Sequence, residues 1–137
     1  MRYLGLDLGT KTLGLAMTDK LGIIASPYKV LRYFDVNKLI DELIDIIHEE
    51  KVDELVLGLP KNMNNSLGFA SERSLYFKEL LENKIDLPIH LVDERLSTME
   101  AENRLIFSDT RRDKRKQVID AYAASIILET YLKSKKG

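Results

Sequence analysis

Acidic residues at three places in the chain could do chemistry together. Asp7 lies within an apolar run, Asp93 and Glu94 follow another, and Asp120 is the lone acid in a stretch of small and apolar residues. A carboxylate in such surroundings is costly unless something compensates its charge. Clustered carboxylates repel one another unless a cation joins them. Oxygen ligands suit Mg²⁺ or Mn²⁺, and a pair of such ions about 4 Å apart can activate water and stabilise the leaving oxygen of a phosphodiester.

Each acid also has a purely structural explanation. Backbone N–H groups of the Gly9-Thr10 turn could satisfy Asp7. The acids that follow the second apolar run could complement the N-terminus of the next helix while paired with Arg95. Asp120 could lie at the edge of an apolar helix face. The residues alone therefore leave the structural and the metal-binding interpretation open at all three places.

A basic segment lies directly upstream of Asp120. It runs from Arg111 to Lys116 and places five basic residues in six positions. A charge run of this kind is usually a solvated surface. Beside a carboxylate cluster, however, its side chains would hold phosphates by direct pairing and counterion release. The loop after residue 59 offers a second phosphate contact through backbone donors, Lys61 and Asn62.

The hydrophobic pattern predicts the elements that would position these residues. The capping-box sequence Ser97-Thr98-Met99-Glu100 predicts a helix directly after the last strand, with a break near Ser108-Asp109. Pro27 indicates an edge position or a bulge in its strand. The order of strands and helical regions, βββαβαβα, predicts an α/β fold with a five-stranded mixed sheet flanked by helices. Strands are expected at Tyr3–Leu8, Leu13–Met17, Ile23–Leu31, Glu54–Leu59 and Ile89–Val92, and helices at about 35–47, 66–83 and 116–133.

Length and composition narrow the class of protein. A chain of 137 residues predicts one domain, covering 1–137. The absence of cysteine excludes disulfides, thiolate nucleophiles and cysteine-based zinc sites, and His48 and His90 have no partner at zinc-motif spacing. No apolar run approaches the roughly 20 residues that span a bilayer, and no signal-peptide core follows Met1, so we expect a cytoplasmic protein with no membrane partner. A net charge of -1 argues against coating of nucleic acid by bulk electrostatics.

Four ordered motifs give the chain a specific resemblance. They are Asp7-Leu8-Gly9-Thr10-Lys11-Thr12-Leu13-Gly14-Leu15-Ala16, Gly58-Leu59-Pro60 with Asn62-Met63, Asp93-Glu94-Arg95-Leu96-Ser97-Thr98, and Asp120-Ala121-Tyr122-Ala123-Ala124. Over almost its whole length the chain resembles the YqgF family, also called RuvX, of pre-16S ribosomal RNA nucleases and Holliday junction resolvases. It departs from the family at Asn64-Asn65, where an acid or Asn followed by Gly is more usual.

The resemblance implies a ribonuclease-H-like fold and metal-dependent phosphodiester hydrolysis. Asp7, Glu94 and Asp120 occupy the catalytic acidic positions, and these three with Asp93 are the expected ligands of Mg²⁺ or Mn²⁺. Contacts to the nucleic-acid backbone are expected from Lys11, Lys61, Asn62, Arg95, Arg111, Arg112, Lys114, Arg115 and Lys116.

Several functions remain open at this point. Processing of the 5′ end of pre-16S rRNA by a monomer or homodimer is favoured, and resolution of four-way DNA junctions would require a symmetric pair of active sites. A non-catalytic nucleic-acid-binding module is a further possibility. Asp7-Leu8-Gly9-Thr10 also looks like the phosphate-binding start of actin-like and sugar-kinase ATPases, but those enzymes close two such domains around ATP and this chain has one copy of the motif.

Overall fold

The computed structural model describes residues 1–59, 69–93 and 112–136, and for 69–70, 112–119 and 136 it describes the course of the helix only. The order of elements along these residues is βββαβαβα, which confirms the order predicted from the sequence. The elements are β1 (Tyr3–Leu8), β2 (Thr12–Thr18), β3 (Ala25–Arg32), α1 (Val36–Glu49), β4 (Glu54–Leu59), α2 (Phe69–Glu82), β5 (Ile89–Asp93) and α4 (Arg112–Lys136).

The strands form one five-stranded mixed sheet in the order β3-β2-β1-β4-β5. The first three strands make an antiparallel meander, whereas β4 runs parallel to β1 and β5 parallel to β4. Parallel strands bring their carboxyl ends to the same edge, so the ends of β1, β4 and β5 meet there. Open α/β sheets bind ligands at this kind of edge.

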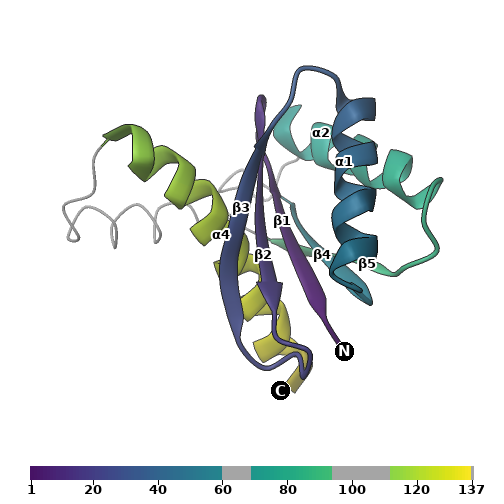
Figure 1. The fold of residues 1–137 in the computed structure, drawn as a ribbon, viewed down its shortest axis with the longest axis vertical. Helices are drawn as coiled ribbons and strands as arrows, with labels where there is room; N and C mark the ends of the chain where they lie inside the picture. Colours follow the sequence, from purple (N-terminus) through teal and green to yellow (C-terminus); the bar gives the residue numbers. More distant parts are fainter. Residues whose placement is uncertain (60–68, 94–111, 137) are drawn as a thin grey trace.

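Helices cover both faces of the sheet (Figure 1). Alternate residues of the central strands, such as Leu4 and Leu6, pack with α1 and α2 in the larger core, where Phe77 and Leu81 are fully buried. The intervening residues face α4, and Tyr3 packs there with small and branched side chains of the helix. This alternation follows from the two-residue period of a strand. It assigns Asp7, two positions beyond Gly5, to the α4 face.

Two glycines allow α4 to lie against the strands. A Cβ on Gly5 would come within 2.8 Å of the Ala124 carbonyl oxygen, and one on Gly14 within 2.1 Å of the Asp120 carbonyl oxygen. Any side chain at either position would therefore lift the helix from the sheet. The small residues Ala123 and Ala124 complete the close contact and are fully buried.

Several boundaries differ from the prediction, most of them by one to three residues. The third strand begins at Ala25 rather than Ile23, because the Asp19 carboxylate accepts the backbone N–H groups of Ile23 and Ile24 at 2.8 and 3.1 Å and holds them in a turn. Those hydrogen bonds hold the pKa of Asp19 below its ordinary value. The predicted irregularity at Pro27 is confirmed, since β3 is an edge strand and its register shifts where Ala16 pairs with Pro27.

The last helix begins at Arg112, four residues earlier than predicted. No glycine or proline interrupts residues 112–136, and arginine and lysine are good helix formers, so residues 112–116 of the basic segment belong to the helix. The predicted helix from Ser97 to about Ser108 lies outside the described residues. Within the described part of the chain, no helix is long and apolar enough to cross a membrane.

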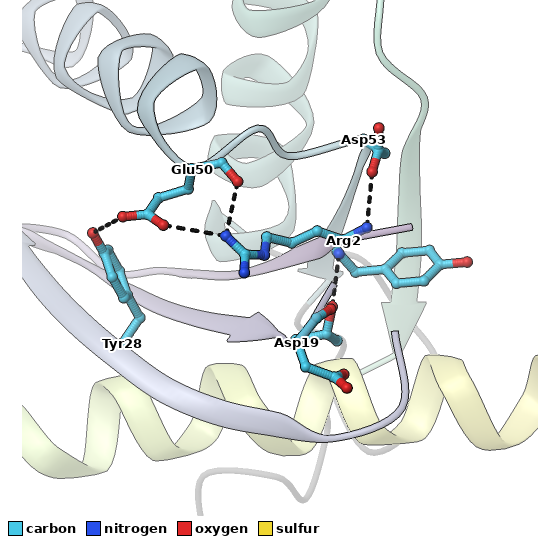
Figure 2. A network of polar contacts seen from close by, with 7 residues as sticks. Arg2, Asp19, Tyr28, Glu50 and Asp53 are labelled. Atoms are coloured by element: carbon cyan, nitrogen blue, oxygen red, sulfur yellow. Dashed lines mark hydrogen bonds and ion pairs between the residues drawn. The ribbon is translucent and has the colours of Figure 1, made fainter. Parts of the chain in front are cut away.

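A polar network connects the elements at the end of the sheet opposite the carboxyl ends of β1, β4 and β5 (Figure 2). Arg2 donates from Nη1 to the Glu50 backbone oxygen at 2.9 Å and to Glu50 Oε2 at 3.2 Å, and its backbone N–H donates to Asp53 Oδ2 at 2.9 Å. Tyr28 donates to the same Glu50 carboxylate at 3.3 Å. These contacts join β1 to the end of α1 and to the residues before β4. The acids of this end thus have structural partners.

Candidate functional site

The side of the sheet covered by α4 carries an acid at the carboxyl end of β1. Asp7 pairs with Gly14 of β2 and is half-buried. It is five residues beyond Arg2, which places it about 16 Å from the network around Arg2 at about 3.3 Å per residue. Asp7 lies in the strand predicted at Tyr3–Leu8, near its carboxyl end.

Asp120 reaches the same place from α4. Its backbone carbonyl lies against Gly14, the strand partner of Asp7. Its carboxylate is anchored to the sheet as well, because Thr12 Oγ1 donates to Asp120 Oδ2 at 3.0 Å. Because side chains alternate along a strand, Thr12 and Gly14 of β2 lie on the same face of the sheet as Asp7 of β1. The fold therefore brings two acids that are 113 positions apart in the chain to one spot at the sheet edge.

Asp93 has a different position from the one expected. It is the last residue of β5, paired with Leu59, and not the first residue beyond the strand. Its neighbour Val92 packs with the α4 side of the sheet, whereas Ile89 packs with the α1 and α2 side. Alternation assigns Asp93 to the face of Ile89, opposite Asp7. The following position, Glu94, lies outside the described residues.

The expected phosphate-binding residues fall into three groups. Lys11 is exposed in the turn between β1 and β2, two residues beyond Gly9. Arg112, Lys114, Arg115 and Lys116 lie on the first turns of α4, which project past the sheet on the side of that turn (Figure 1). Lys116 precedes Asp120 by four residues, or about 6 Å along the helix axis. Lys61, Asn62, Arg95 and Arg111 lie outside the described residues.

Two further residues at this edge were not identified from the sequence as site residues. Arg32 pairs with Thr12, so this exposed cation lies one strand away from the hydroxyl that holds Asp120. Tyr33 donates from its hydroxyl to the Gly9 carbonyl at 2.5 Å, and its backbone N–H donates to the Lys11 carbonyl at 3.0 Å. Burial raises the pKa of the Tyr33 phenol. Arg32 and Tyr33 could have been identified as residues of this edge only from the pairing of β2 with β3.

The donor set at the edge is suitable for a hard divalent cation, although the described residues hold only part of a site. Two carboxylates converge there with a hydroxyl, and all are oxygen groups of the kind that Mg²⁺ and Mn²⁺ prefer. Over 1–59, 69–93 and 112–136, no three histidine, cysteine or acidic residues are grouped as a complete metal site requires. His90 serves a structural contact instead, stacked on Tyr131 at 4.7 Å and bonded to Glu54 Oε1 at 2.8 Å.

Comparisons with known proteins identify the family of the chain. A family model described as "RuvX: Holliday junction resolvase" matches residues 1–134. Two relatives are named "Putative pre-16S rRNA nuclease". The one from Desulforamulus reducens is 48% identical over 134 residues and the alignment covers 98% of each chain. The one from Geobacillus sp. is 50% identical over 138 residues, covering 99% of this chain and 100% of the relative.

The fold is also similar to that of a solved resolvase structure. T. thermophilus RuvC in complex with a Holliday junction substrate superimposes with a TM-score of 0.64, at 14% identity, over 98% of this chain and 96% of that one. At this identity the likeness concerns the fold, and it confirms the expected α/β, ribonuclease-H-like class. Because the family model spans nearly the whole sequence and close relatives share about half of it, the chain belongs to the RuvX family.

Proposed function

We propose that this RuvX-family nuclease hydrolyses nucleic-acid phosphodiesters with Asp7, Glu94 and Asp120 as metal ligands, and that its substrate is the 5′ end of the pre-16S rRNA. The observation that carries the proposal is the convergence of Asp7 and Asp120 at the carboxyl edge of the sheet, with Thr12 bonded to Asp120 at 3.0 Å. The names of relatives at 48% and 50% identity support the substrate.

The chain's own residues have distinct parts in this reaction. Asp7 and Asp120 supply negative charge from a strand and a helix that are packed tightly together, so their separation is fixed before substrate arrives. Thr12 orients the Asp120 carboxylate. Asp93 faces the α1 and α2 side of the sheet, away from Asp7, and this favours Glu94 over Asp93 as the third ligand. Lys11 and the basic first turns of α4 hold the substrate phosphates.

The cation would be Mg²⁺ or Mn²⁺, held by these carboxylates. When bound, such an ion supplies charge stabilisation for the phosphate oxygens and activation of water near neutral pH. Hydroxyl and carboxylate oxygens without nitrogen or sulfur donors favour these ions over zinc.

A second substrate is supported by the family description and by the likeness to a resolvase bound to a Holliday junction. Cutting a four-way junction needs two equivalent sites, hence a homodimer. The two substrates are separable because an rRNA precursor can be cut by a monomer.

The test is a cleavage assay with both substrates. Purified protein is incubated with a 5′-extended pre-16S rRNA fragment or a four-way DNA junction, with Mg²⁺, Mn²⁺ or a chelator. Asp7→Asn and Asp120→Asn remove one charge each, and Asp45→Asn is the matched control, since Asp45 is an exposed acid on α1 at the other face of the sheet. We expect metal-dependent cutting of the rRNA that both site variants abolish and the control keeps. Cutting that survives both site variants would reject the mechanism, and cutting of the junction alone would reject the substrate.

A further inference from the structure

Phe34 stands out among the hydrophobic residues of the described chain. It lies in the connection between β3 and α1 and is 102% exposed, more than any other large hydrophobic side chain there. Isolated hydrophobic residues on a surface are common. The setting of Phe34, however, differs from that of Leu21, Ile23 and Ile24, which lie together in the turn at the other end of the sheet.

The backbone on both sides of Phe34 is held in place. Tyr33 is bonded through its hydroxyl to Gly9 and through its N–H to Lys11. Asp35 caps α1 by accepting the backbone N–H of Asn37 at 2.9 Å. The ring is therefore exposed on a loop whose backbone is already held in place. A ligand that covers it would lose little free energy to ordering of the loop.

The same loop forms the rim of the proposed active site. Gly9 and Lys11 belong to the turn that follows Asp7, and Arg32 pairs with the Thr12 that binds Asp120. Figure 1 shows the β3–α1 connection, the β1–β2 turn and the first half of α4 at one end of the molecule. Phe34 thus lies next to Tyr33, which is hydrogen-bonded to the turn that follows Asp7.

Arg32, Lys38 and Lys11 against Asp35 and Glu42 leave one excess positive charge around the ring, which favours an anionic partner. Arg32, Lys38 and Glu42 line a hollow of about 280 Å³ together with Phe34, and Lys11 is exposed beside the loop. Asp35 also lines the hollow, but its carboxylate is engaged in the helix cap. An exposed aromatic face flanked by cations matches the two recurring contacts of single-stranded nucleic acid, base stacking and phosphate pairing.

We infer that Phe34 is a stacking platform for an unpaired base of the substrate, close to the cleaved phosphate, with Arg32 and Lys11 on the neighbouring phosphates. The inference deepens the proposed function and rests on it for the nature of the substrate. It gives the enzyme a preference for single-stranded positions over continuous duplex, because a paired base cannot reach the ring without leaving its stack.

The chain contains no tryptophan, which provides a direct test. Phe34→Trp introduces a single indole, and a base stacked on it should quench its fluorescence. Leu21→Trp is the matched control, since Leu21 is 76% exposed in the turn between β2 and β3, at the far end of the sheet. Both variants are titrated with a 12-nucleotide single-stranded RNA carrying an end label, and binding is followed in parallel by anisotropy of the label. We expect quenching in Phe34→Trp alone.

A second measurement separates stacking from charge. Phe34→Ala should bind the single strand about 10-fold more weakly than wild type does. A strand of equal length with abasic positions should bind to Phe34→Ala and to wild type with the same affinity. Ile24→Ala is the control for loss of an exposed hydrophobic residue and should bind both strands like wild type. Absence of quenching in Phe34→Trp, with or without binding, overturns the inference, as does an equal loss of affinity for normal and abasic strands. Because these readouts need no cleavage, quenching without cleavage would reject the nuclease mechanism alone, and cleavage without quenching would reject the platform alone.

Discussion

Substitution of Gly14 by alanine should push α4 away from the sheet at the point where Asp120 is held. The added Cβ would lie 2.1 Å from the Asp120 carbonyl oxygen and 2.5 Å from the carbonyl carbon. Ordinary contact begins at 3.4 Å, so the two backbones must separate by about 1 Å. Both clashing atoms belong to the main chain, and no side-chain rotation can relieve the contact.

The structure sets the size of the effect. Overpacking of a well-packed interface typically costs about 1–3 kcal/mol, and a backbone clash belongs at the upper end of that range. A catalytic group displaced by about 1 Å can lose about 100-fold in rate. We therefore expect Gly14→Ala to reduce the free energy of unfolding by about 3 kcal/mol and the rate of metal-dependent cleavage by about 100-fold.

Urea denaturation measures the free energy of unfolding. Single-turnover cleavage at a temperature where the variant is folded measures the cleavage rate. Gly5→Ala is the control, since its Cβ would meet the Ala124 carbonyl oxygen at 2.8 Å, one helical turn beyond Asp120. It should lose less stability and less activity. If Gly14→Ala unfolded and cleaved like wild type, or if both variants lost activity equally, Asp120 would not depend on this contact for its position.

Three further perturbations follow from the structure. Thr12→Val keeps the shape of the side chain but removes the donor to Asp120, so the metal concentration for half-maximal cleavage should rise about 10-fold. Thr12→Ser keeps the hydroxyl and should restore the wild-type value. An unchanged metal dependence in Thr12→Val would contradict this role. Asp19→Ala should be less stable than wild type in urea at pH 7. Because folding lowers the pKa of Asp19, this difference should be full above about pH 5 and shrink as the pH falls below 3.8, whereas a constant difference would assign the effect to another cause. Phe77→Ala should lose about 3–5 kcal/mol of stability, since the ring is fully buried between α2 and the sheet, and a loss under 1 kcal/mol would contradict that packing.

The order of elements could be predicted because strands and helices leave different hydrophobic periods. The Tyr3–Leu8 strand and the amphipathic first helix are local patterns that the structure confirms. Asp7 and Asp120 could be identified as candidates because each is an acid in apolar surroundings. Their convergence depends on two glycines and a threonine whose importance appears only when α4 is packed on β2.

Other features depend on contacts between distant parts of the chain. The start of β3 could not be placed because the Asp19 side chain competes with the strand for two backbone N–H groups. The position of Asp93 required the register of β5 against β4, because its pairing with Leu59 extends the strand one residue beyond the predicted end. Arg32 and Phe34 have no sequence motif, and they reach the site edge only because β3 pairs with the start of β2.

The central claim is that Asp7 and Asp120 hold one metal site. It can be tested most directly by adding Mn²⁺ to ¹⁵N-labelled protein and following the paramagnetic broadening of backbone amide signals. The account predicts the strongest broadening at Leu8, Gly9 and Ala121, much weaker broadening around Arg2 and Glu50 at the opposite end, and loss of the effect in both Asp7→Asn and Asp120→Asn. Broadening centred elsewhere, or unchanged in the two variants, would contradict it.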